Sequence, residues 1–226
     1  MGGLFYLITF ASSIPAVFLL APVLNDSNYI VSSDTDTRVV FGNVLDIVNA
    51  LACVGSAVAL FPVVKRQSEP LALGFVTSRM FEAAVIAIGV VSLLTIVSLR
   101  QPGATGAEAT SLVLTGQTLV AAYHWVFLLG PNVMAAVNAL LLGTLMYKSG
   151  LVPRVIPVIG PVGAPLLLGV TLATMFGLTE RGTAWWGLVA PIFLWELSLG
   201  IHLVVKGFKP SPIMADLAAT RMSVSA

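Results

Sequence analysis

Four ionisable side chains lie inside stretches of sequence that are otherwise apolar: Asp46, Arg79, Glu82 and Glu196. An ionised group at the centre of an apolar membrane helix costs about 2.5–3.5 kcal/mol even on a lenient scale, so it normally faces a partner or a water-filled cavity. The stretch SRMFEAA, residues 78–84, places an arginine and a carboxylate three residues apart, where two side chains meet over one helical turn. We therefore expect Arg79 to pair with one of these three carboxylates.

The charges of this group do not balance, because three carboxylates face a single formal cation. Two negative charges cannot stay uncompensated in a medium of low dielectric constant, so at least one carboxylate is protonated at neutral pH or a cation is bound. A structural interpretation is also open, because a buried arginine with a carboxylate partner fixes which helix lies beside which. The residues alone allow a structural cluster or a site for a proton, a cation or a small polar ligand.

Helical periodicity gathers polar residues onto shared faces. At 100° per residue, Asp46, Asn49 and Cys53 fall within a sector of about 80°, and Arg79 and Glu82 share a face in the same way. Counting about 1.5 Å per residue from the helix ends places all four charges roughly 10–16 Å below one membrane boundary, so one layer could hold them. The candidate buried polar cluster is Asp46, Asn49, Arg79, Glu82 and Glu196.

The amino-acid composition indicates whether water or lipid surrounds the helices that carry this cluster. The chain has 226 residues, of which 58% are hydrophobic and 9% are charged, and its mean hydropathy is +0.99. An ordinary soluble domain carries about a quarter charged residues, so the sequence indicates an integral membrane protein that has the lipid bilayer as its main partner. The formal net charge of +1 provides no basic surface, so nucleic acid is not an expected partner.

Apolar runs of about 20 residues, long enough to cross ~30 Å of hydrocarbon, define six candidate spans. They lie near residues 3–23, 39–64, 71–99, 131–148, 155–178 and 184–206, and a short cytoplasmic tail follows at residues 207–226. The joins between them are short and polar. We expect one integral membrane domain over residues 1–226 with an all-α fold, a polytopic transmembrane helical bundle.

The uncharged segment 109–147 allows either one span or two. With six spans, seven basic residues lie on one side and three on the other, whereas a seventh span would put Lys148 and Arg154 opposite Lys65. Six spans fit the positive-inside rule better and place both termini in the cytoplasm. Segment 109–129 then becomes an amphipathic helix at the outer face, lying in the interface or leading at a kink into the fourth span.

Prolines recur at four-residue steps in the fifth candidate span, at Pro157, Pro161 and Pro165. Each lacks an N–H and its ring clashes with the preceding turn, so three on one face predict a bent helix between residues 155 and 166. Freed carbonyls within a bilayer need protein or water partners, so this stretch should pack inward. A packing adjustment or a broken helix that lines a binding site would each produce the pattern.

The sequence carries no signature of a cofactor or metal site. Cys53 is the sole cysteine, so an internal disulfide and a cysteine-rich metal site are excluded. His124 and His202 are expected ~25 Å apart in depth, too far for two axial ligands of one haem iron. Since G-x-S-x-G, H-E-x-x-H and P-loop motifs are also missing, we expect no cofactor and do not favour an enzyme.

Four stretches together carry a family resemblance: GLFYLITFASSIPA (3–16), SRMFEAAVIAIGVVSLL (78–94), FLLGPNVMAAVNALLLGTLMYKSGLVPR (127–154) and WELSLGIHLVVKGFKP (195–210). They resemble the bacterial membrane-protein family catalogued as domain-of-unknown-function family 4386. The resemblance implies a multi-span protein of the bacterial cytoplasmic (inner) membrane with unassigned activity, and it supplies no catalytic residues. It coincides with the polar cluster, because Arg79, Glu82 and Glu196 lie inside the matching stretches.

Three functional classes are compatible with such a cluster, and each predicts a different interior. A small transporter or proton-coupled carrier would show an aqueous path to Glu196 and a discontinuous fifth helix. An accessory subunit that binds another membrane protein would show an apolar groove facing lipid and a sealed core. An intramembrane enzyme would show a lipid-open cavity that holds two carboxylates.

We predict that cysteines introduced on a Cys53→Ser background report opposite faces of the membrane. A cysteine at position 34 should label from outside with an impermeant maleimide and one at position 67 only from inside, because basic residues concentrate on the inner side. Labelling of both positions from the same face of intact cells would contradict the six-span arrangement.

Overall fold

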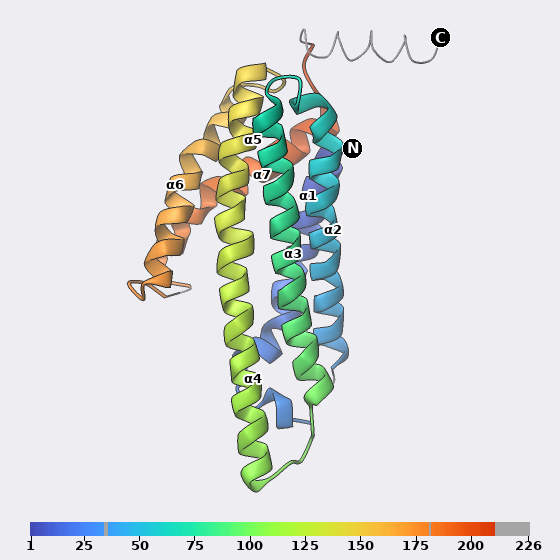
Figure 1. The fold of residues 1–226 in the computed structure, drawn as a ribbon, viewed down its shortest axis with the longest axis vertical. Helices are drawn as coiled ribbons and strands as arrows, with labels where there is room; N and C mark the ends of the chain where they lie inside the picture. The colour runs from blue at the N-terminus through green and yellow to red at the C-terminus, as the bar shows by residue number, and fades with distance from the viewer. Residues whose placement is uncertain (34–35, 181, 211–226) are drawn as a thin grey trace, which may run out of the picture.

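The computed structural model describes residues 1–33, 36–180 and 182–210. Within those residues the chain is helical, and six helices are long and apolar enough to span a membrane, which confirms the predicted bundle (Figure 1). The elements are α1 (Gly2–Asn25), η1 (Tyr29–Val31), α2 (Thr37–Val64), α3 (Glu69–Leu99), α4 (Gly106–Phe127), η2 (Leu128–Met134), α5 (Ala135–Ser149), α6 (Val155–Met175), η3 (Ala184–Val189) and α7 (Ala190–Val205). η1 and η3 are short 3₁₀ helices, and η2 is a π-helix.

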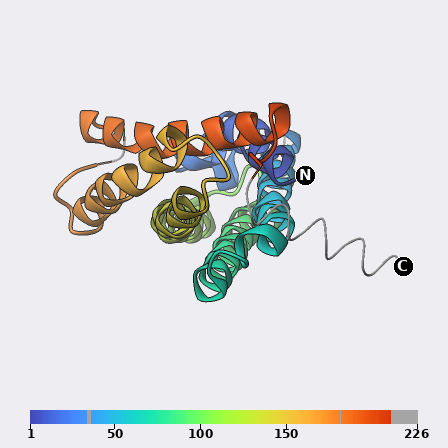
Figure 2. The same ribbon diagram turned by 90° about the horizontal axis from the view of Figure 1, so that it is seen from above.

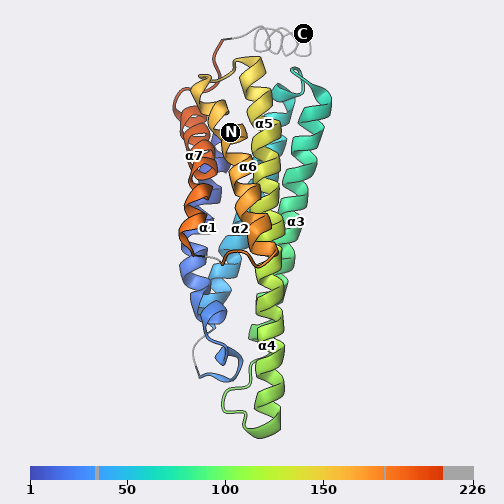
Figure 3. The ribbon, with the colours of Figure 1, turned by 90° about the vertical axis from the view of Figure 1, so that its left-hand side faces the viewer.

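The fourth spanning element differs from the predicted pair of a separate outer helix and a short span. α4, η2 and α5 follow one another without a loop, so Gly106–Ser149 forms one long helical column (Figures 1 and 3). Pro131 lies in η2, where the wider π-helical turn accommodates its missing N–H. Two arrangements were predicted for residues 109–129, a helix in the interface or a helix that leads into the fourth span, and the structure shows the second.

The spanning helices form a closed ring in chain order. α1 packs on α2, α2 on α3, α3 on α4 and α5, α5 on α6, and α6 on α7. α7 then returns to pack on α1, as the view along the bundle shows (Figure 2). Short connections favour this order because they keep neighbours in sequence adjacent in space. The ring brings residues from both ends of the chain to one interior.

The two ends of the bundle differ in charge. The α2–α3 and α5–α6 connections lie at the same end as Met1 and the end of α7 (Figure 1). This basic end carries Lys65, Arg66, Lys148, Arg154, Lys206 and Lys209, and the opposite, far end carries Arg38 and Arg100. Arg181, labelling position 34 and tail residues 211–226, with Arg221, lie outside the described residues.

Apolar clusters fill the interior on both sides of the candidate site. The basic-end core is a cluster whose largest fully buried side chains include Tyr6, Phe75, Leu142, Met146 and Trp195. The far-end core consists of Leu20, Val23, Tyr29, Ile30, Val39, Leu93 and Ile96. The polar cluster lies between them, at the middle of the bundle.

The proline pattern of the fifth span has a smaller effect than expected. Pro157 lies in the first turn of α6, where backbone N–H groups have no intrahelical acceptor, so only Pro161 and Pro165 remove a helical hydrogen bond. This corrects the expectation of three losses. α6 is helical from Val155 to Met175 without a break, unlike a discontinuous helix. A bend at these prolines stays a prediction.

We predict that Gly143→Ala destabilises the bundle because α5 and α6 approach closely there. A Cβ at Gly143 would lie 2.6 Å from Cδ of Pro161 and 3.2 Å from the carbonyl oxygen of Pro157. Overpacking of this kind costs about 1–3 kcal/mol, so the melting temperature of the detergent-solubilised protein should fall clearly. Gly169→Ala in α6 is the matched control, since none of the described residues lies within 4 Å of its Cβ. Equal losses in the two variants would contradict the close approach.

Candidate functional site

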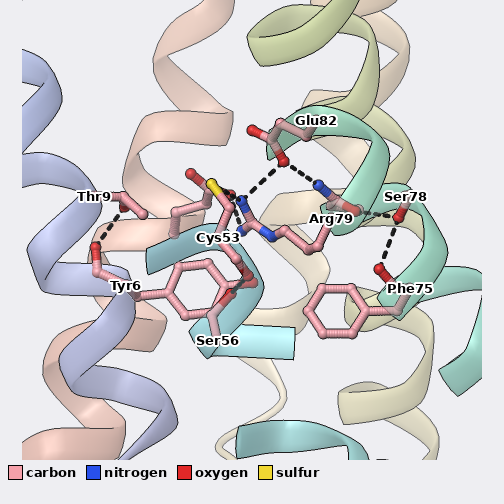
Figure 4. A network of polar contacts seen from close by, with 10 residues as sticks. Tyr6, Thr9, Cys53, Ser56, Phe75, Ser78, Arg79 and Glu82 are labelled. Carbon is pink, nitrogen blue, oxygen red and sulfur yellow. Dashed lines mark hydrogen bonds and ion pairs between the residues drawn. The ribbon is translucent and has the colours of Figure 1, made fainter. Parts of the chain in front are cut away.

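Arg79 occupies the centre of the site and is only 2% exposed. Its Nη1 donates to Oε2 of Glu82 at 3.1 Å, one turn further along α3 (Figure 4). Its Nη2 donates to Oε1 of Glu196, on α7, at 2.7 Å. The predicted ion pairing of Arg79 is confirmed, with two carboxylate partners. Because Glu196 belongs to another helix, the guanidinium also joins α3 to α7.

A neutral layer extends the ion pair to α5. Nδ2 of Asn138 donates to Oε2 of Glu82 at 2.7 Å. The Ser78 hydroxyl lies between the amide oxygen of Asn138 and the carbonyl oxygen of Phe75, and donates to one of them. Asn138 was not assigned to the site from the sequence. The signal that could have found it is its polar amide within the uncharged segment 109–147.

Aromatic rings and a thiol complete the surroundings of the guanidinium. Its central carbon lies 4.8 Å from the ring centroid of Tyr6 and 6.0 Å from that of Phe75, within the range of cation–π attraction. Nη1 also lies 3.7 Å from Sγ of Cys53 (Figure 4). The buried Nε–H has no acceptor among the described residues. Contacts from α1, α2, α3 and α7 therefore converge on one cation.

A cavity of about 280 Å³ adjoins the ion pair. The whole predicted polar cluster lines it: Asp46, Asn49, Arg79, Glu82 and Glu196. The rest of the wall is mainly apolar and aromatic, and comes from α1, α4, η2, α5 and α7. The structure thus brings together every residue that sequence reasoning assigned to the cluster.

Asp46 differs from the other two carboxylates of the cavity. No hydrogen bond or ion pair joins Asp46 to Arg79 in the part of the chain that the structure describes. The neighbour that hydrogen-bonds its carboxylate is the phenol of Tyr123, on α4. Asp46 therefore faces the cavity with a neutral partner, whereas Glu82 and Glu196 compensate the same guanidinium.

The cavity is closed at one end and open at the side. Tyr6, Phe75 and Trp195, all fully buried, close it toward the basic end. Ile14 on α1 and Phe193 on α7 line the cavity, yet they are 45% and 43% exposed. Exposed apolar residues in a membrane-spanning helix face lipid, so the cavity reaches the lipid-facing surface of the bundle.

The formal charges on the cavity wall do not balance. Among the described residues, three carboxylates and one guanidinium line the cavity, a formal excess of negative charge. Within the same residues no group of three or more histidine, cysteine or acidic side chains is placed to hold a metal ion. A cation bound here would be recognised by single carboxylates and aromatic walls instead of a multidentate ligand set.

The fold and this site define a polytopic α-helical membrane protein with an ion pair buried beside a carboxylate-lined cavity. Residues 1–207 match the model of the family described as Domain of unknown function (DUF4386), so the chain belongs to that family, as its sequence resemblance predicted. The match includes every residue of the polar cluster. No curated protein and no solved structure matches the chain.

We predict that removing Arg79 alone does more harm than removing the complete ion pair. Arg79→Ala leaves the buried Glu82 and the partly buried Glu196 without their cation, and breaking a buried pair in this way costs about 3–5 kcal/mol. The triple variant Arg79→Ala/Glu82→Gln/Glu196→Gln also removes the abandoned charges, so it should melt at a higher temperature than Arg79→Ala in the same detergent. If the triple variant melts no higher than Arg79→Ala, the charges do not organise the bundle.

Proposed function

We propose that this protein binds a small cationic group in the cavity between α1, α2, α3, α4 and α7. The observation that carries the proposal is the excess of carboxylates over cations on the cavity wall. Buried negative charge without a counter-ion is strongly unfavourable, so a proton or a bound cation must compensate it. The cavity provides the space that a counter-ion larger than a proton requires.

In this proposal the residues of the polar cluster have two different roles. Arg79, Glu82 and Glu196 hold α3 and α7 together and serve as structure, because their charges are directly paired at 2.7–3.1 Å. Asp46 is the ligand-binding carboxylate, because its hydrogen-bonding partner, Tyr123, is neutral and Asp46 lines the same cavity. Asn49, one turn away on α2, adds an amide oxygen that accepts from an N–H donor.

The apolar wall supports an organic cation over a bare metal ion. Phe10, Tyr123, Phe127 and Phe193 contribute aromatic rings to the cavity. Aromatic faces attract ammonium groups through their quadrupoles, most strongly where water is excluded. A hydrated inorganic ion would exchange much of its water shell for apolar walls, because among the described residues no group of three or more acidic, histidine or cysteine side chains is placed to hold it.

A carrier is the second candidate function, because the cavity is closed toward the basic end and open elsewhere. By the positive-inside rule, we infer that the basic end faces the cytoplasm of a bacterial cell, so the cavity is closed on its cytoplasmic side and opens to the bilayer. A carrier would also need a state in which the layer of Tyr6, Phe75 and Trp195 opens. Uptake of the cation by proteoliposomes, beyond binding, distinguishes a carrier from a binding protein.

We predict saturable binding of radiolabelled tetramethylammonium to the purified protein in a scintillation proximity assay. Asp46→Asn should weaken this binding by at least about tenfold, the equivalent of 1.4 kcal/mol, because it removes the carboxylate with no cationic partner. Glu69→Gln is the matched control, since Glu69 is an exposed carboxylate at the basic end of α3 and should not matter. Absence of saturable binding, or equal binding by Asp46→Asn and the native protein, would refute the proposed site.

A further inference from the structure

The side opening of the cavity lies at the middle of the membrane-spanning part of α1. Ile14 and Val17 form its edge on α1, and Val126 and Phe127 line the cavity from α4. Figure 3 shows α1 and α4 apart at this side of the bundle, with α2 behind them. Val17 is 57% exposed, so the edge of the cavity belongs to the outer surface of the bundle.

The depth of this opening decides what surrounds it. α1 runs from Gly2 to Asn25, so Ile14 lies roughly 16–18 Å from either end of the helix at 1.5 Å per residue. The hydrocarbon core of a bilayer is ~30 Å thick, so the edge at Ile14 and Val17 faces acyl chains. A molecule that reaches the cavity through this opening comes from the bilayer.

The size of the cavity limits which part of such a molecule it holds. Sites for whole drug-sized ligands occupy about 300–1,000 Å³, and this cavity, at about 280 Å³, is at the small end of that range. It has room for a head group, and an attached chain would continue through the side opening. The wall charges favour a cationic head, and the exposed apolar edge favours an apolar chain.

Resting on the cation site proposed above, we propose that the ligand is an amphiphilic amine. Its ammonium head lies in the cavity beside Asp46, and its alkyl chain leaves between α1 and α4 into the bilayer.

A route through water is the alternative to the side opening. A second cavity of about 350 Å³ lies at the far end and is lined by Asp26, Gln117 and His124, among others. Residues of the far-end core also line this second cavity, and Val120 and Tyr123 of α4 pack against that core. A ligand that used this route would need no chain and would be blocked by added bulk at Gln117.

The test compares two cations on protein held in lipid nanodiscs, with empty nanodiscs subtracted. Decyltrimethylammonium should displace radiolabelled tetramethylammonium at concentrations at least about tenfold lower than unlabelled tetramethylammonium does, because its chain concentrates it in the bilayer. Decyl sulfate, an amphiphilic anion, should not displace the label. Equal potency of the two cations, or displacement by decyl sulfate, overturns the amphiphilic amine while leaving the cation site in place.

Substitutions separate the two routes. Val17→Trp should raise the concentration of decyltrimethylammonium needed for displacement at least about tenfold, the equivalent of 1.4 kcal/mol, and by a clearly larger factor than it changes the Kd of tetramethylammonium. Val91→Trp, which adds the same bulk to an exposed position of α3 outside the cavity wall, should have no effect. If Val17→Trp does not fold, Ile14→Trp replaces it. If Gln117→Trp, and not Val17→Trp, raises the concentration of decyltrimethylammonium needed for displacement, the side route is overturned. If the native protein does not bind tetramethylammonium at all, the cation site itself is refuted.

Discussion

A single buried cation organises the interior of this protein. Arg79 is nearly inaccessible, and removing its charge from water is tolerable only because two carboxylates, a thiol and two aromatic rings surround it. These groups come from four different helices, and Asn138 adds α5 through Glu82. The helices must therefore hold a definite rotation and depth, since a shift of one turn would separate the charges by about 5.4 Å.

Small residues at the basic end allow this arrangement. A Cβ at Gly3 would lie 2.7 Å from the carbonyl oxygen of Gly200, so α1 and α7 approach almost to backbone contact. A Cβ at Gly160 of α6 would lie 2.9 Å from the nearest ring atoms of Trp195. Close approach of this kind is how membrane helices gain packing energy without a hydrophobic driving force between them. It brings α7 near enough for Glu196 to reach across to Arg79.

The two sides of the ion pair differ in how closely the helices pack. On the side of Arg79 toward the basic end, large side chains such as Trp195 and Phe75 fill the ring of helices. On the side toward the far end, α1 and α4 lack a shared packed interface at the level of Ile14, and the carboxylates line the cavity. This interior is neither the sealed core of a purely structural subunit nor an aqueous path along the whole bundle. A polar cavity reached from lipid suits a ligand that is itself partly apolar.

Composition and local spacing are sufficient for the membrane class, for six spans and for the contact between Arg79 and Glu82. Each depends on the hydrophobic effect or on neighbours within one helical turn, which the order of residues specifies directly. The choice of Glu196 over Asp46 as the second partner was decided by the tertiary structure, because it joins residues 117 positions apart and depends on how α7 returns to α1. Asn138, Tyr6 and Tyr123 likewise became site residues through packing, since neutral side chains in an apolar helix carry no large desolvation cost to reveal them. The cavity and its side opening also come from the tertiary structure, because an empty volume depends on where whole helices fail to touch.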